Sequence, residues 1–378
     1  MLAATQHDSQ VGHDYELLKS LGIRTVRDAV RWHLIERDGK FDFSSLAPMV
    51  VAAEGHGMQI LWTLLHYGVP DDVDFFSSQF PARFARFSAE VARFIGSHSA
   101  RLPFYIPINE VSFLSWASGE VGWFSPFAKG RGDELKAQLV RAAVASCDAV
   151  WSVDRRARIV HVDPIIHIVP SAMHPELSDV AERYRESQFE SWDMLAGIRA
   201  PELGGHTRYL DIMGVNFYHS NQWERGGERI RWEETPRDPR WQPFHRMLAE
   251  VYDRYRRPLF VGETSHIGVG RADWLREIAA ELWSANDEGI PLEGVCLFPI
   301  IDRMDWNDDN HWHNSGLWDL VRRPDGVLDR VLHVEYAQEL RHSQALLARC
   351  GWGEPQPANE ARARTDDERA DAKFKGER

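Results

Sequence analysis

The chain has little cysteine and no excess of positive charge, and both shortages narrow the classes of protein to which it can belong. Its three cysteines, Cys147, Cys296 and Cys350, are far apart, odd in number and without the spacing of metal ligands. This pattern of cysteines is typical of a protein in a reducing compartment, and it predicts no structural disulfide. Lys and Arg total 44 against 57 Asp and Glu, a net charge of −13. Such a balance repels a phosphate backbone, so nucleic acid is not expected as a partner.

Long apolar runs are missing as well. No uncharged stretch approaches the roughly 18 residues that suggest a membrane span, and the chain does not open with a basic segment followed by an apolar one. We therefore expect no membrane association and a cytoplasmic location. Beyond Gly353 the sequence is charged, contains proline and shows no apolar periodicity. Residues 354–378 are accordingly predicted to form a disordered tail.

What the sequence does contain is a regular alternation of two patterns. Short apolar runs rich in β-branched residues predict seven strands, at residues 24–32, 58–67, 102–109, 158–168, 210–218, 258–263 and 292–301. Stretches with helical character predict helices near residues 12–21, 44–56, 81–97, 133–151, 176–196, 242–256, 271–288 and 329–348. Strands and helices that alternate in this way form parallel βαβ units. Their number predicts an α/β fold, a (β/α)8 TIM-type barrel, as a single domain over residues 1–353.

The strand count falls one short of a closed barrel, which has eight strands. The opening segment MLAATQHDSQ is polar and leads directly into the first expected helix. The first strand is therefore expected to be missing from this chain. Either the chain starts late, which we favour, or something else covers the gap, since two unpaired strand edges are otherwise left open.

Two glutamates stand at positions where a barrel places its chemistry. Glu110 and Glu263 each end an expected strand, and the carboxyl ends of barrel strands share one rim. A lone glutamate at a strand end is more often a surface or capping residue. A pair across a small gap is what acetal hydrolysis requires, because one carboxyl protonates the leaving oxygen while the other attacks or shields the oxocarbenium-like carbon. The pair predicts a glycosidase.

Six expected strand ends carry short motifs in a fixed order. They are Arg27 with Trp32, His66-Tyr67 with Pro70, Asn109-Glu110, Asn216-Phe217-Tyr218, Val261-Gly262-Glu263-Thr264 and Phe298-Pro-Ile-Ile-Asp302-Arg303-Met-Asp305-Trp306. In that order they resemble the Arg-Phe-Ser-x-x-Trp, His-Trp-Asp-Leu-Pro, Asn-Glu-Pro, Asn-Tyr-Tyr, Ile-Thr-Glu-Asn and Trp-Ser-Leu-x-Asp-Asn-Phe-Glu-Trp motifs of the family 1 glycoside hydrolases. This is the β-glucosidase and 6-phospho-β-glucosidase group of retaining (β/α)8 enzymes. The resemblance extends from about Asp14 to Val321.

The resemblance implies a role for each matched residue. Glu110 takes the place of the acid/base and Glu263 that of the nucleophile, with their carboxyl groups roughly 5.5 Å apart as double displacement with retention requires. Arg27 contacts the nucleophile, and Tyr218 donates a hydrogen bond to it. The other residues expected to bind the sugar are His66, Asn109, Asn216, Phe298, Asp305 and Trp306.

Departures from the family pattern leave the sugar unidentified. Phe298 stands where the family has a tryptophan platform, Asp305 is shorter than the family's glutamate, and the first-strand glutamine has no counterpart. The expected function is a retaining exo-β-glycosidase that acts on a small β-glycoside or oligosaccharide without a cofactor. Two alternatives stay open, an endo-acting glycanase of the same clan and a barrel that binds sugar without catalysis. The oligomeric state also stays open.

Two segments allow more than one interpretation. The connection at 219–243 is long, and Trp223, Trp232 and Trp241 make it either a wall for the leaving group or a surface insertion. Aspartates and histidines between 302 and 313 suggest a metal at first sight. Their spacing fits no calcium loop, so we expect a solvated rim and no metal.

Overall fold

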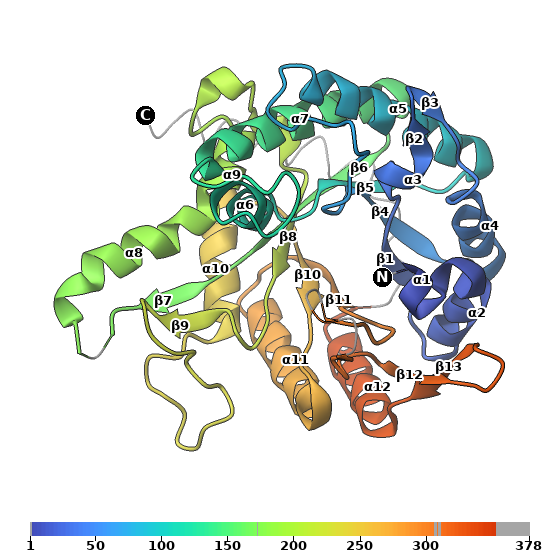
Figure 1. The fold of residues 1–378 in the computed structure, drawn as a ribbon. Coiled ribbons are helices and arrows are strands. Elements are labelled where there is room, and N and C mark those ends of the chain that lie inside the picture. The colour runs from blue at the N-terminus through green and yellow to red at the C-terminus, as the bar shows by residue number, and fades with distance from the viewer. Residues whose placement is uncertain (1, 172, 306–307, 309–310, 353–378) are drawn as a thin grey trace.

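A computed structural model describes residues 2–171, 173–305, 308 and 311–352 (Figure 1). The tail predicted for residues 354–378 lies outside them. A seven-stranded parallel sheet curves into a nearly closed barrel. Its strands, in spatial order, are β1 (Thr25–Ala29), β4 (Gln59–Leu65), β5 (Phe104–Ile108), β6 (Arg158–Pro164), β8 (Ile212–Asn216), β10 (Leu259–Thr264) and β11 (Leu292–Leu297). The predicted barrel with one strand missing is confirmed.

Helices surround the sheet and connect its strands (Figure 1). The principal ones are α2 (His7–Ser20), α4 (Ala47–His56), α5 (Phe80–His98), α7 (Gly132–Val153), α8 (Ser178–Glu186), α9 (Glu190–Leu195), α10 (Phe244–Tyr255), α11 (Arg271–Asp287) and α12 (Val334–Ala348). In α5 the buried side chains Phe84, Phe87, Val91 and Ile95 recur at helical spacing, and the helix packs closely on α7. None of the helices among the described residues combines the length and the apolar character that crossing a bilayer demands.

The barrel strands have two buried faces, which explains their continuous apolar runs. Ile159 of β6 belongs to the main core between sheet and helices, whereas Val160 and Val162 of the same strand point into the barrel. The inner cluster consists of Leu61, Ile106, Val160, Val162, Ile212 and Phe260. This inner packing supports the strand ends from below, so the rim above it is firmly held.

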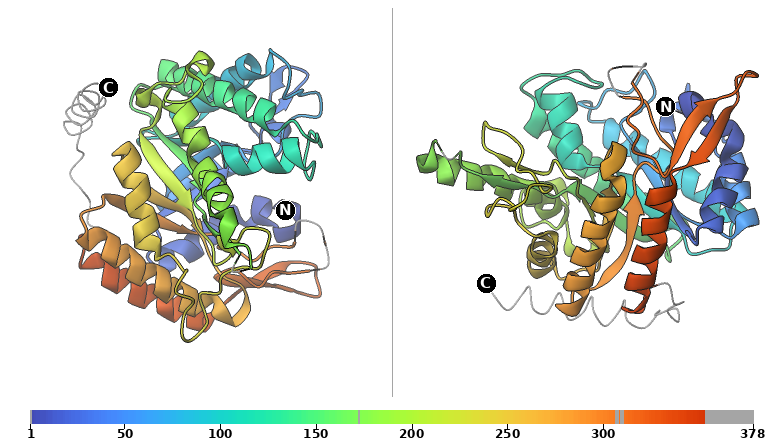
Figure 2. Two further views of the ribbon diagram at one scale, coloured as in Figure 1. Left: turned by 90° about the vertical axis from the view of Figure 1, so that its left-hand side faces the viewer. Right: turned by 90° about the horizontal axis from the view of Figure 1, so that it is seen from below.

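The open side of the barrel lies between β1 and β11, the two ends of the strand order. Residues of both strands line a cavity of about 4470 Å³ that also reaches residues of the barrel interior. Above this opening a hairpin of β12 (Trp318–Arg322) and β13 (Leu328–Leu332) lies beside α2 (Figure 2). The contact is ionic, because Arg330 Nε lies 2.6 Å from Asp14 Oδ1 and both side chains are buried. The two ends of the barrel sequence are thus joined without a strand pair.

The hairpin corrects one sequence expectation. The helix predicted over 329–348 starts only at Val334, where the His333 side chain caps it by accepting from the Tyr336 N–H at 3.2 Å. Residues 328–332 alternate between more and less buried positions, as a strand does. The stretch 176–196 is likewise divided into α8 and α9 by a short 3₁₀ turn at Ser187–Phe189.

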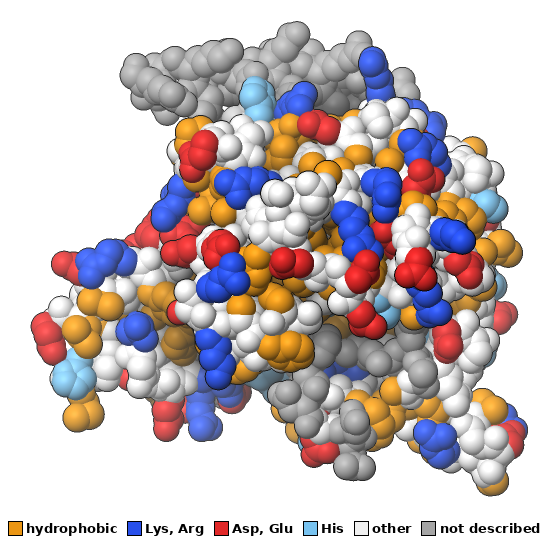
Figure 3. Space-filling view, turned by 45° about the horizontal axis from the view of Figure 1, so that its top comes forward, with side chains coloured by type: hydrophobic (Ala, Val, Ile, Leu, Met, Phe, Trp, Pro, Cys, Tyr) orange, Lys and Arg blue, Asp and Glu red, His pale blue; other side chains and the backbone are white. Residues whose placement is uncertain are grey.

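Small elements complete the rim and the surface. They are α1 (Leu2–Thr5), α3 (Trp32–Ile35), α6 (Val111–Leu114), the π-helix η1 (Ser115–Glu120), and the strand pairs β2 (Glu36–Arg37) with β3 (Lys40–Phe41) and β7 (His167–Val169) with β9 (Gln222–Glu224). On the face shown in Figure 3, Lys and Arg side chains are interspersed with Asp and Glu. The prediction that the protein does not bind nucleic acid stays a prediction.

Candidate active site

The carboxyl ends of β5, β8 and β10 bring the two predicted catalytic glutamates to one rim. Glu110 follows β5 directly, and Glu263 lies in β10 in register with Asn216, the last residue of β8. Both carboxyl side chains are enclosed, since Glu110 is 9% exposed and Glu263 is 5% exposed. Burial of two acidic groups this near one another demands specific partners for each.

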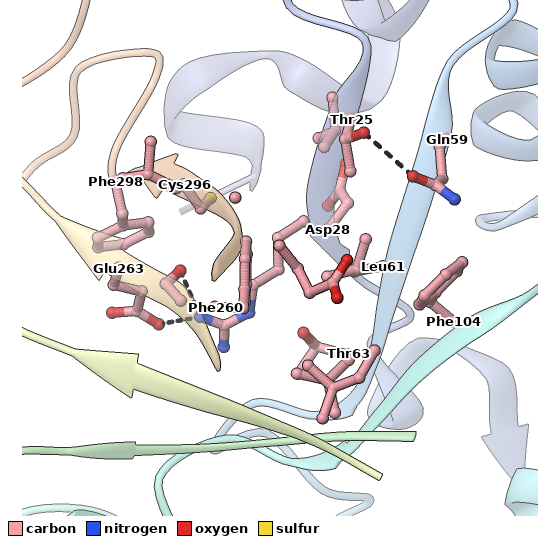
Figure 4. A pocket seen from close by; sticks show the side chains of 18 of the residues that line it. Thr25, Asp28, Gln59, Leu61, Thr63, Phe104, Phe260, Glu263, Cys296 and Phe298 are labelled. Atoms are coloured by element: carbon pink, nitrogen blue, oxygen red, sulfur yellow. Dashed lines mark hydrogen bonds and ion pairs between the residues drawn. The ribbon is translucent and has the colours of Figure 1, made fainter. Parts of the chain in front are cut away.

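Glu263 is held by a cation and a phenol. Arg27 of β1 donates from Nη1 to Glu263 Oε1 at 2.5 Å, an ion pair drawn as a dashed line in Figure 4. The hydroxyl of Tyr218 donates to Glu263 Oε2 at 2.7 Å. Arg27 also donates to the Gly262 carbonyl at 3.2 Å. Both carboxylate oxygens are therefore fixed in position by hydrogen bonds.

Glu110 has neutral partners instead. Asn216 Nδ2 donates to Oε1 at 2.8 Å, and the Tyr67 hydroxyl donates to Oε2 at 2.6 Å. Burial, followed by the negative charge of Glu263, raises the pKa of Glu110 to about 8 against the opposing effect of these two hydrogen bonds. Glu110 therefore carries a proton at neutral pH, as a general acid must.

The backbone beside Glu110 is strained. Glu110 has φ 49° and Tyr67 has φ 66°, both in the left-handed region that side chains other than glycine rarely adopt. The two residues contact one another through the hydrogen bond just described. Strain of this kind gathers where the surrounding structure fixes functional groups.

Asn109 and His66 fill the space between the two glutamates and β4. Asn109 Oδ1 accepts a hydrogen bond from Arg27 Nη2, and its Nδ2 donates to the Tyr67 hydroxyl at 3.1 Å. His66 Nε2 lies 3.5 Å from Asn109 Nδ2. Burial lowers the pKa of His66 to about 4, so its ring is neutral and suited to a sugar hydroxyl. The structure brings both predicted residues to the site.

The residues after β11 are brought together only in part. The backbone N–H of Phe298 donates to the Thr264 carbonyl at 3.1 Å. Its ring lies beside Glu263 in the cavity shown in Figure 4. Asp305 Oδ2 lies 2.7 Å from His313 Nε2, so this carboxylate already has a partner. Trp306 lies outside the described residues. Among the residues that are described, no three His, Cys, Asp or Glu side chains are arranged to hold a metal ion.

Solved structures resemble this chain in fold. A family 1 β-glucosidase from Thermotoga maritima has a TM-score of 0.71 over 90% of this chain and 86% of its own, at 16% identity. The AHE enzyme from Alicyclobacillus herbarius has a TM-score of 0.71 over 90% and 87%, also at 16% identity. The T. maritima β-glucosidase in complex with castanospermine gives 0.70 over 92% and 88%, again at 16%. The chain has the fold of these proteins. No family model and no curated protein matches its sequence.

The positions of the tryptophans in the loop at 219–243 bear on its interpretation as a wall for the leaving group. Trp232 and Trp241 are buried, Trp232 against Trp274 at 5.2 Å between ring centroids and Trp241 against Phe217 at 6.4 Å. Two of the three tryptophans proposed as a wall for the leaving group therefore stabilise the loop from within.

Sequence reasoning missed the part played by Tyr67. The family motif has tryptophan at this position, and Tyr67 was matched to it only as part of His66-Tyr67, with no role of its own. Its hydroxyl contacts both Glu110 and Asn109, which an indole cannot reproduce because it donates but does not accept. The sequence could have indicated this role, because it has a tyrosine at a strand end where the family motif has a tryptophan.

Proposed function

We propose that the protein is a retaining β-glycosidase that removes a terminal sugar from a small β-glycoside. One observation carries the proposal, the opposite environments of two buried carboxyl groups at one rim. Glu263 pairs with Arg27, whereas burial and the negative charge of Glu263 raise the pKa of Glu110 to about 8, which favours its protonated form at neutral pH. Acid and nucleophile are distinguished in this way in retaining enzymes.

In the first step Glu263 attacks the anomeric carbon. A bond forms from its carboxylate oxygen to that carbon while the bond to the leaving oxygen breaks, and Glu110 delivers its proton to that oxygen. Tyr218 and Arg27 hold the attacking carboxylate in place. Neutral His66 and Phe298 line the same cavity as Glu263, where both can contact the sugar.

In the second step Glu110 changes role. Once Glu263 is esterified it has no charge, so the repulsion that helped to raise the pKa of Glu110 is gone. Glu110 has lost its proton to the leaving group and now accepts one from water, which attacks the anomeric carbon and releases Glu263. A single residue serves both steps because its neighbour's charge alternates.

A fluorosugar trap tests the assignment. A 2-deoxy-2-fluoro glycoside with a good leaving group should label the wild type, and the intact mass should rise by one fluoroglycosyl unit. Glu263→Gln should abolish the label, whereas Glu90→Gln, which alters a half-buried glutamate of α5 paired with Arg93, should label normally. Labelling that survives in Glu263→Gln protein contradicts the assigned nucleophile.

A glycoside panel separates the alternatives. Release of the β-anomer first, followed by NMR, indicates retention and exo-action on a small substrate. Internal cleavage of a polysaccharide would favour the endo-acting glycanase. Folded wild type that binds sugars but hydrolyses none of them would identify a binding barrel without catalysis.

A further inference from the structure

A third carboxyl group is buried near Glu110, and the proposed mechanism does not use it. Asp163 lies in β6 and is 1% exposed. Its carboxylate accepts the Ser112 N–H at 3.1 and 3.2 Å, the Ser112 hydroxyl at 2.9 Å and the hydroxyl of Ser191 in α9. A buried carboxylate is costly to desolvate, and all of these donors are neutral. The position of Asp163 so near Glu110 therefore points to a role in the site.

Two consecutive residues of β6 hold the backbone on both sides of Glu110. The Glu110 N–H donates to the Val162 carbonyl at 3.1 Å. Two residues further along the chain, the Ser112 N–H donates to the Asp163 carboxylate. Between these two contacts Glu110 has φ 49°, in the left-handed region. A strained conformation of this kind persists only where the surrounding structure fixes it, and here β6 does so.

Glu110 occupies the N-cap position of α6, but its side chain does not cap the helix. An N-cap side chain commonly accepts a free N–H of the first turn. The Glu110 carboxyl instead accepts from Asn216 and Tyr67. The Ser112 N–H, which belongs to the first turn of α6, is accepted by Asp163 in its place. Asp163 thus caps the helix from the neighbouring strand and leaves the Glu110 carboxyl to the site.

We infer that Asp163 is a positioning residue for the general acid, because it caps the turn after Glu110 and so holds the strained backbone that directs the Glu110 carboxyl. The inference rests on the proposed function, in which Glu110 protonates the leaving oxygen. Without Asp163 the first turn of α6 has an unpartnered N–H, and Glu110 is free to relax to an ordinary backbone conformation. Proton delivery is then impaired, whereas Glu263 is still held by Arg27 and Tyr218.

Substrates that differ in their leaving group test this role, because a good leaving group departs without a proton. Asp163→Ala should lower kcat/KM for a phenyl β-glycoside by roughly tenfold to a hundredfold. For the 2,4-dinitrophenyl β-glycoside of the same sugar, kcat/KM should change little. Glu110→Gln, which removes the acid itself, should show the same pattern with a larger loss. The ratio kcat/KM is compared because it reports the step in which the bond to the leaving oxygen breaks.

Asp211 offers a matched control at the opposite end of β6. Its carboxylate also accepts a backbone N–H of this strand, that of Ile159 at 3.1 Å, and it pairs with Arg158. Asp211→Ala should affect the two glycosides equally, because it is remote from the acid. Asp163→Asn should retain most of the activity that Asp163→Ala loses, since an amide oxygen still accepts the Ser112 N–H.

The outcomes distinguish this inference from the proposed function. Equal losses for the two glycosides in folded Asp163→Ala protein would overturn the inference, and so would an alanine variant as active as the wild type. If the alanine variant does not fold, Asp163→Ser provides the same comparison, because its hydroxyl stops one bond short of the carboxylate oxygens. Hydrolysis of neither glycoside by folded wild type would instead overturn the proposed function, and with it the role of Glu110 as the acid.

Discussion

At the scale of single residues, two glutamates with the same side chain have different environments because their neighbours differ. Glu110 and Glu263 are both buried, yet one faces amide and phenol donors and the other faces a guanidinium. A charge held in a site of low dielectric interacts more strongly than in water, so exchanging a neutral neighbour for a charged one decides the protonation state. In the proposed mechanism, Arg27 of β1 therefore distinguishes the two glutamates, because it pairs with Glu263.

The hydrogen bond from Tyr67 to Glu110 allows a specific test of the pH dependence of activity. In the proposed mechanism Glu110 acts as the acid, and its pKa is raised to about 8, so kcat/KM should fall as the pH rises through that value. The Tyr67 hydrogen bond lowers this pKa, so Tyr67→Phe should move the alkaline limb to higher pH by about one unit. The pH profile of aryl glycoside hydrolysis measures this shift.

A matched variant separates a local effect from a general loss of packing. Tyr105→Phe removes a hydroxyl from another buried tyrosine, on β5 and within the outer core, and should leave the alkaline limb where it is. An unchanged limb in Tyr67→Phe protein would show that this phenol does not tune Glu110.

At the scale of elements, the sequence predicted the barrel strands because their chemistry is uniform. A strand buried on both faces is mostly apolar, as the runs in β6 and β8 are, so it can be recognised without knowledge of its partner strands. The hairpin residues of β13 are only half-buried and read as part of a helix. The apolar pattern of a sequence therefore predicts secondary structure least well in segments that are only partly buried.

The site was predictable to the extent that its residues end such strands. Glu110, Asn216 and Glu263 follow from position and residue type. Contacts between side chains from different strands do not, because they depend on backbone conformation, such as the left-handed φ of Tyr67 and Glu110. The π-helix at Ser115–Glu120 likewise could not be predicted from apolar periodicity.

Glycines of the barrel strands provide a test of how strand packing supports the site. A Cβ at Gly262 of β10 would lie 2.6 Å from Asn216 Oδ1 and 3.1 Å from Val162 Cγ1. Gly262→Ala should therefore displace Asn216 from Glu110, lower kcat/KM by roughly tenfold or more and cost about 1 to 3 kcal/mol of unfolding free energy. Kinetics and urea unfolding measure the two effects.

Gly294 of β11 is the matched control. Among the residues that the structure describes, a Cβ there would meet only the Phe260 ring, at 3.7 Å, which is ordinary contact. Gly294→Ala should change kcat/KM and stability little. Equal effects at both glycines would mean that the crowding at Asn216 does not matter for activity.

At the scale of the whole molecule, the open side of the barrel separates two parts of the active site. Arg27 comes from β1 and Phe298 follows β11, so the site spans the gap between the edge strands (Figure 4). Closure depends on the contact of α2 with the β12–β13 hairpin, where Gln6 Nε2 donates to the Gly326 carbonyl at 3.0 Å and Arg330 pairs with Asp14. The ion pair of Arg27 with Glu263 is a second link across the gap.

The gap predicts a gradient of stability around the barrel that hydrogen exchange can measure. Within the described residues β1 and β11 pair with one strand each, so alternate amides of both face away from any strand partner. In β6 and β8 both sides are paired. Amides of β1 and β11 should therefore exchange faster than those of β6 and β8 in native protein, by about tenfold or more, because edge strands open at lower free energy. Mass spectrometry of peptides from the four strands tests this order. Equal protection would mean that the edges are covered in solution, and the measured molecular mass would then show whether a second copy covers them.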